Sequence, residues 1–128
     1  MFEQGTTKAM LNLDTGEIVV RRVYLADTFR RRLLGLILRS KIDEDEGLLL
    51  LPCKGVHTFF MRFPIDVIYL DRYMSVVALF PDTRPWRVLP QMPGVAQVLE
   101  MPAGTISKNK IKVGNTLAFT SLPLAFLP

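Results

Sequence analysis

The chain has 128 residues, a formal net charge of +4, 49% apolar residues and 22% charged residues, a composition that excludes an intrinsically disordered protein. The length predicts a single domain over residues 1–128. No apolar run reaches the roughly 18 residues of a membrane span, and the first residues do not resemble an export signal. The one cysteine cannot form an internal disulfide. We therefore expect a cytoplasmic protein without a membrane partner.

The first third of the chain predicts a hairpin followed by one helix. Two extended runs, 8–13 and 17–24, flank an Asp-Thr-Gly turn, which is typical of antiparallel strands. Residues 28–34 form the predicted helix, because Phe29 and Leu33 are four residues apart and three arginines lie between them. This part of the sequence therefore contributes the only helix that we expect.

The rest of the chain reads as short strands separated by turns. Apolar or alternating runs predict strands over residues 48–51, 65–70, 75–80, 96–101 and 111–119. Lys108, Lys110 and Lys112 alternate and would share one edge of an extended segment. Basic clusters of this kind can meet phosphates, but no recognition motif accompanies them, which disfavours nucleic-acid binding. The pattern predicts a mainly β fold with a minor helical part.

Residues 53–71 hold the only cysteine and the only histidine of the chain, and the sequence is organised around them. Residues 58–63 predict an extended segment with Phe59 and Met61 on one face, and Pro64 predicts a bend. Asp66 then falls within an apolar strand. Since a buried carboxylate needs partners, we expect Arg62, His57, Thr58 or turn amides to supply them. Two interpretations stay open, a structural clamp and a catalytic or ligand-binding group.

The segment 81–94 is the longest irregular stretch and holds the only tryptophan, Trp86. Loops of this length in compact domains are often functional. A large aromatic side chain also commonly anchors a loop to the body of a protein. Trp86 is therefore either such an anchor or a ligand-facing residue.

A small-molecule site is the function that we favour from these residues. Phe59, Phe60, Met61 and Trp86 would line a pocket, and a few charged groups would orient the ligand, which is the usual make-up of such sites. The candidate ligand-binding residues are His57, Thr58, Phe60, Met61, Arg62, Asp66, Trp86 and Glu100.

Two other classes of function remain. His57, Asp66 and Glu100 can move protons in an uncharacterised enzyme, with Cys53 as a nucleophile, although no nucleophile signature is present. The same aromatic residues can instead be plain core in a structural or protein-interaction domain. We predict no metal and no cofactor, because one cysteine and one histidine make a poor zinc ligand set. The apolar tail 117–128 packs either on its own domain or on a second copy, which would make a homodimer.

Three separated blocks of the sequence resemble one known family. They are His-Thr-Phe-Phe-Met-Arg-Phe-Pro-Ile-Asp at 57–66, Val-Leu-Glu-Met-Pro-Ala-Gly at 98–104 and Ile-Lys-Val-Gly-Asn at 111–115. In these blocks the chain resembles domain-of-unknown-function family 192, over a core of about 29–119. The resemblance implies a compact, mostly β fold, with antiparallel or mixed strands rolled into a barrel-like sheet and one short helix. It implies no established reaction. The family usually has Gly-Asp where this chain has Gly114-Asn115, and a glycine in the turn where it has Arg72-Tyr73.

Overall fold

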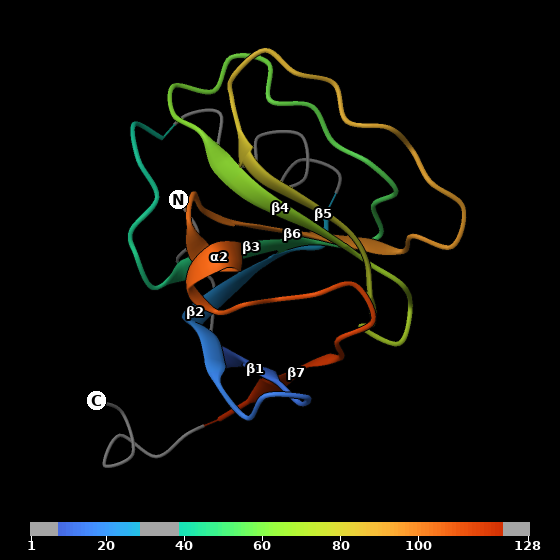
Figure 1. Cartoon of the computed structure of the whole chain (residues 1–128). Coiled ribbons are helices and arrows are strands. Elements are labelled where there is room, and N and C mark those ends of the chain that lie inside the picture. The colour runs from blue at the N-terminus through green and yellow to red at the C-terminus, as the bar shows by residue number, and fades with distance from the viewer. Residues whose placement is uncertain (1–7, 29–38, 122–128) are drawn as a thin grey trace.

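The computed structural model describes residues 8–28 and 39–121 (Figure 1). Within them, seven strands form one sheet in the order β5-β4-β6-β3-β2-β1-β7. The strands are β1 Lys8–Asn12, β2 Ile18–Ala26, β3 Glu46–Leu50, β4 Ile65–Leu70, β5 Val76–Thr83, β6 Gln97–Pro102 and β7 Leu117–Thr120, and the helix is α2 Thr105–Lys108. This helix is not long and apolar enough to cross a membrane.

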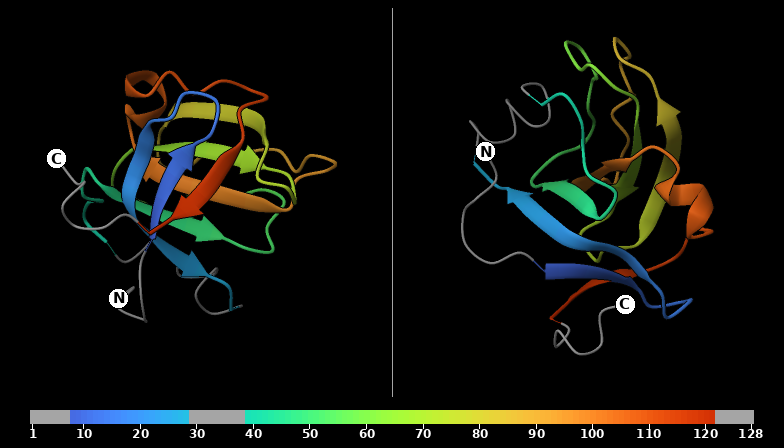
Figure 2. Two further views of the ribbon diagram at one scale, coloured as in Figure 1. Left: turned by 90° about the horizontal axis from the view of Figure 1, so that it is seen from below. Right: turned by 90° about the vertical axis from the view of Figure 1, so that its left-hand side faces the viewer.

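The sheet is mixed and curls into a half-barrel, as predicted. β2 and β3 run parallel, and the other neighbouring strands run antiparallel. Figure 2 shows the curl from two further sides. At one end the two edge strands approach each other, because Ser75 before β5 bridges Thr116 before β7, and the Leu117 amide donates to the Met74 carbonyl at 2.9 Å. These contacts close that end of the curl.

Two apolar clusters lie on the two faces of the sheet. One cluster takes side chains from all seven strands, and it packs against Ile106 of α2 and the nearby Ile111, so it lies inside the curl. The other covers the outer face of the middle strands and includes side chains from two long loops. β4 is buried on both faces, with Ile65 and Val67 outside and Ile68 inside, as its unbroken apolar run predicted.

The C-terminal third differs from its prediction. Residues 108–112 do not form an extended segment, because α2 ends at Lys108 and Lys110 has a positive φ of 50°. The strand predicted over 111–119 begins only at Leu117, since Gly114 has a φ of 95° and places a turn before it. The three lysines therefore do not share a strand edge.

Two predicted segments extend beyond the described residues. Except for Thr28, the helix predicted over residues 28–34 lies outside them. Of the apolar tail 117–128, β7 accounts for residues 117–120, whereas residues 122–128 lie outside the described part of the chain. The other predicted strands agree with the structure to within a few residues at their ends.

Candidate functional site

Two loops, 52–64 and 84–96, run side by side across the outer face of the sheet (Figure 1). The Cys53 amide donates to the Ala96 carbonyl at 2.9 Å, and the Leu89 amide donates to the Val56 carbonyl at 2.9 Å. The loops pack on the sheet through apolar side chains, namely Val56, Met61, Phe63, Leu89 and Met92. The sheet thus supports both loops along their length.

Thr58 joins the two loops at their end. Its buried hydroxyl donates to the Arg84 carbonyl at 2.6 Å and accepts from the Arg87 amide at 2.9 Å. Its own carbonyl accepts from the Trp86 amide at 3.0 Å and from the Met61 amide at 3.2 Å. The segment 58–63 is therefore a turn and not the extended run that its alternation predicted, because Thr58 bonds to its own loop and to the neighbouring loop.

Four rings gather at this end of the loops, and we call His57, Phe59, Phe60 and Trp86 the aromatic tip. Ring centroids lie 4.9 Å apart for His57 and Phe59, 5.7 Å for Phe59 and Trp86, and 4.9 Å, edge to face, for Phe60 and Trp86. Phe60 is 63% exposed and Trp86 is 58% exposed. The Trp86 ring thus packs on the other rings at the surface and does not anchor its loop to the sheet.

Both exposed aromatic residues have a strained backbone. Phe60 has a φ of 66° and Trp86 has a φ of 67°, in the left-handed region that bulky side chains rarely adopt. Each such residue destabilises a fold by about 1–3 kcal/mol and persists only where its surroundings hold it. Here the hydrogen bonds of Thr58 hold both turns.

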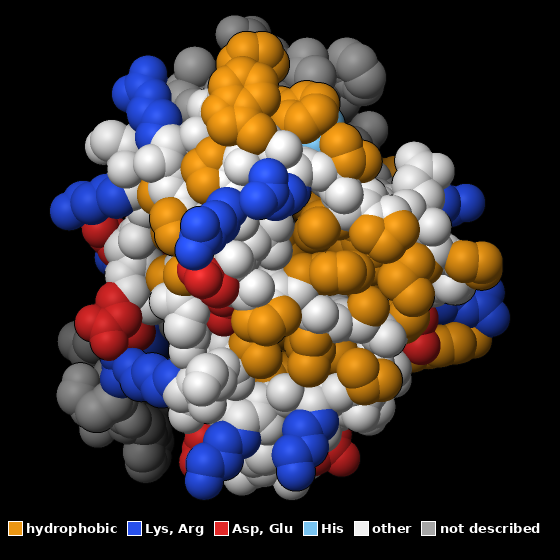
Figure 3. Space-filling view, turned by 45° about the horizontal axis from the view of Figure 1, so that its top comes forward, with side chains coloured by type: hydrophobic (Ala, Val, Ile, Leu, Met, Phe, Trp, Pro, Cys, Tyr) orange, Lys and Arg blue, Asp and Glu red, His pale blue; other side chains and the backbone are white. Residues whose placement is uncertain are grey.

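Three exposed arginines lie close in the chain to residues of the aromatic tip. Arg62, Arg84 and Arg87 are exposed and lie within three residues of Phe60 or Trp86 in the chain. Within the described residues, none of the three forms an ion pair. Figure 3 shows Lys and Arg side chains beside the group of hydrophobic side chains that borders the histidine. The tip therefore combines open ring faces with positive charge.

Asp66 lies away from the tip and binds backbone amides of two other elements. It is completely buried on the inner face of β4. Its carboxylate accepts from the Asp82 amide at 2.8 Å and from the Ile106 amide at 2.7 Å. These two amides belong to β5 and to the first turn of α2, so one side chain ties three elements together. Of the expected partners, the amides are the ones found.

Glu100 is the second carboxylate set into the sheet. It is 4% exposed and lies between Leu48 of β3 and Val67 of β4, on the outer face. Burial raises the pKa of Glu100 from its ordinary 4.5 to about 7.

The predicted site therefore separates into three parts. His57, Thr58, Phe60 and Trp86 come together, with Arg62 exposed beside them and Met61 buried below as an anchor. Asp66 and Glu100 point to opposite faces of the sheet, so His57 and the two carboxylates do not converge. Among the described residues, no group of three His, Cys, Asp or Glu side chains could hold a metal ion.

Three residues in or next to the aromatic tip were not among the predicted ligand-binding residues. Phe59 was expected to line the pocket but was not included in the site, and Arg84 and Arg87, which flank Trp86, were not included either. The sequence did carry one signal for the arginines, since they flank the only tryptophan on both sides. What it did not show was the pairing of the two loops, which depends on contacts of Thr58 with residues 26 and 29 positions away.

Comparison with known proteins identifies relatives over most of the chain. The model of family DUF192, described as "Uncharacterized ACR", matches residues 10–119, which adds the first hairpin to the predicted core. A UPF0127 protein of Thermococcus sibiricus is 33% identical over 84% of this chain and 72% of its own length. A UPF0127 protein of Pyrococcus furiosus is 34% identical over 88% of this chain and 99% of its own.

A solved structure shows the same fold. A Novosphingobium aromaticivorans protein of unknown function has a TM-score of 0.75 and 22% sequence identity, over 88% of this chain and 84% of its own. At this identity the likeness concerns the fold alone.

Proposed function

Because the chain belongs to domain-of-unknown-function family 192, whose description carries no activity, we propose a function from the geometry: a module that binds a small ligand at the aromatic tip. The ligand class that the tip fits is a planar ring system carrying an anionic group. This proposal keeps the predicted aromatic residues but places the ligand at the exposed end of the loop pair and not in an enclosed pocket.

One observation carries the proposal, the strained display of two large rings. Phe60 and Trp86 both have left-handed backbone conformations while their rings face solvent. If the rings served stability alone, burying them in the sheet would gain more than exposing them on strained turns. Backbone strain of this kind is concentrated at binding and catalytic sites.

The chemistry of the tip selects the ligand. Exposed aromatic faces stack on planar rings, and each such contact with a nucleic-acid base is worth about 1–3 kcal/mol. Arg62, Arg84 and Arg87 add positive charge that no carboxylate neutralises within the described residues. Guanidinium groups bind carboxylate and phosphate oxygens through paired hydrogen bonds. A ligand with only a ring would leave the arginines without a partner, and a ligand with only an anionic group would leave the aromatic rings without one.

A titration with adenosine monophosphate tests the proposal. Because the chain has one tryptophan, the indole N–H signal in a nitrogen–proton NMR spectrum reports on Trp86 alone. We expect this signal to shift saturably with adenosine monophosphate, and to shift less with adenosine or with ribose 5-phosphate at equal concentration. Trp86→Gly lacks the indole and is therefore followed through the backbone amide signal of Arg87; it should bind at least about tenfold more weakly, which corresponds to the loss of one stacking contact.

Tyr73→Ala is the matched control for this titration. Tyr73 is also an exposed aromatic residue beside an arginine, Arg72, but it lies in the turn between β4 and β5. Its loss should leave the affinity unchanged. A response to ribose 5-phosphate equal to that of the nucleotide, or no saturable shift with the nucleotide, would contradict the proposal.

We also propose that the protein works in the cytoplasm, where thiols stay reduced. The Cys53 thiol is half-buried, and its Sγ donates to the Gly55 carbonyl at 3.2 Å. The melting temperature should therefore be the same with and without reductant. A clear drop on adding reductant would mean that Cys53 bridges two chains, and the assignment to the cytoplasm would lose its basis.

A further inference from the structure

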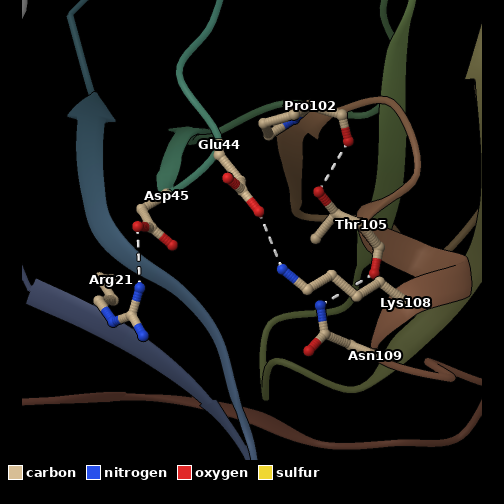
Figure 4. A network of polar contacts seen from close by, with 7 residues as sticks. All are labelled: Arg21, Glu44, Asp45, Pro102, Thr105, Lys108 and Asn109. Carbon is tan, nitrogen blue, oxygen red and sulfur yellow. Dashed lines mark hydrogen bonds and ion pairs between the residues drawn. The ribbon is translucent and has the colours of Figure 1, made fainter. Parts of the chain in front are cut away.

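A groove of about 420 Å³ lies between β2, the turn before β3, and α2 (Figure 4). Its volume is within the range of about 300–1,000 Å³ that is usual for small-ligand sites. The side chains that matter for its chemistry are Arg21, Glu44, Asp45, Thr105, Lys108 and Asn109. None of them belongs to the aromatic tip or to the predicted site.

Charged groups of both signs line this groove. On one wall, Arg21 Nη1 donates to Asp45 Oδ2 at 2.8 Å. Lys108 Nζ of α2 donates to Glu44 Oε1 at 3.1 Å, and this ion pair joins the two walls (Figure 4). The groove is thus lined by two cationic and two anionic side chains, whose charges add up to zero.

Each wall is held in place by bonds of its own. In the turn before β3, the Asp43 amide and Arg39 both donate to the Glu46 carboxylate, at 2.9 and 2.7 Å. Around α2, the Thr105 hydroxyl donates to the Pro102 carbonyl at 2.7 Å. The walls therefore keep their shape when the ion pair between them opens.

Not every polar atom of these side chains is open to a ligand. Arg21 Nε is buried and forms no hydrogen bond among the described residues, so a ligand in the groove does not reach it. The groups that a ligand can reach are those of the well-exposed Glu44 and Lys108.

We propose that the groove binds a small zwitterion, with an ammonium and a carboxylate separated as in a free dipeptide. Glu44 and Lys108 are both well exposed, so their ion pair contributes little and opens readily. The ligand ammonium then pairs with Glu44 and the ligand carboxylate with Lys108. A ligand with one charge would leave either Glu44 or Lys108 without a partner.

Titration of the whole protein with alanyl-alanine tests this site independently of the aromatic tip. The backbone amide signals of Glu44 and Lys108 should shift saturably with the dipeptide. N-acetyl-alanyl-alanine, which lacks the cation, and alanyl-alanine amide, which lacks the anion, should bind about tenfold more weakly, as expected when one charged contact is lost. Glu44→Gln should weaken the dipeptide by about the same factor.

Lys110→Gln is the matched control, because Lys110 is an exposed lysine just beyond α2 that does not line the groove. It should leave the affinity for the dipeptide unchanged. Three results would overturn the proposal: no saturable shift, equal binding of the dipeptide and its two blocked forms, or equal affinities of Glu44→Gln and Lys110→Gln.

Discussion

Two buried carboxylates, Asp66 and Glu100, show how the same chemical group serves a fold in different ways. Asp66 accepts hydrogen bonds from two backbone amides, so its negative charge is satisfied without a basic side chain. Glu100 sits between Leu48 and Val67, and burial raises its pKa to about 7. The sequence indicated that Asp66 needed partners, but both amide donors come from segments distant in the chain, at positions 82 and 106.

Replacing Asp66 by asparagine should destabilise the protein. Asparagine keeps the shape but places an NH₂ group against an amide that needs an acceptor, and it loses two charge-assisted bonds. We expect a loss of about 1.5–3 kcal/mol in the free energy of unfolding, measured with urea. Asp82→Asn is the control, because the Asp82 side chain is exposed and only its amide bonds to Asp66. Equal stabilities of the two variants would exclude the clamp.

Replacing Glu100 by glutamine should change how stability depends on pH. Between about pH 4.5 and 7 the folded state binds this proton more tightly than the unfolded chain does, so stability falls as pH rises through that window. The full effect is about 3 kcal/mol at 1.36 kcal/mol per pKa unit. Glu100→Gln should remove this fall and be more stable than the wild type at pH 8. Melting temperatures at pH 5 and pH 8 measure the difference.

Glu46 has the opposite effect on how stability depends on pH, and its effect lies at lower pH. Burial acts to raise the pKa of Glu46, but hydrogen bonds from Arg39 and the Asp43 amide outweigh it, and that pKa lies below the ordinary 4.5. Its stabilising effect is lost only when the pH falls through that lower pKa. It therefore does not disturb a comparison between pH 5 and pH 8. A Glu100→Gln variant that keeps the wild-type pH dependence would show that another group titrates there.

At the scale of elements, the loop pair was the hardest part to predict. The alternation over 58–63 favoured a strand, yet Phe60 lies in the left-handed region and the chain turns there. The helix α2 was missed because it has four residues and no side-chain cap at Gly104. Both elements owe their shape to contacts with distant segments, which local sequence patterns do not contain.

Thr58→Val should loosen the loop pair. Valine has nearly the same shape, but it leaves the Arg87 amide and the Arg84 carbonyl without their buried partner. We expect a loss of about 1–3 kcal/mol in unfolding free energy, together with faster hydrogen exchange at the Trp86 amide. Thr120→Val in β7 serves as the control, since no hydrogen bond of its hydroxyl contributes to the loops. Unchanged exchange at Trp86 would mean that other contacts hold the tip.

For the whole molecule, the mainly β class, the rolled mixed sheet and most strands were predictable. β4 illustrates why, because six consecutive buried residues between Pro64 and Asp71 leave few alternatives. The meeting of β5 and β7 near Ser75 and Thr116 was not predictable, since it joins residues 41 positions apart. The half-barrel thus provides a rigid base, and the parts that we propose as binding sites are a loop end and a groove at its margin.

The central claim is that the aromatic tip displays strained rings in order to bind a ligand. Urea unfolding of the wild type, Trp86→Gly and Tyr73→Ala, each with and without adenosine monophosphate, tests it most directly. At ten times its dissociation constant, the nucleotide should stabilise the wild type and Tyr73→Ala by about 1.4 kcal/mol. It should stabilise Trp86→Gly by no more than about 0.4 kcal/mol, the value for tenfold weaker binding, because glycine accepts the φ of 67° but has no ring. Equal stabilisation of all three proteins would contradict the claim.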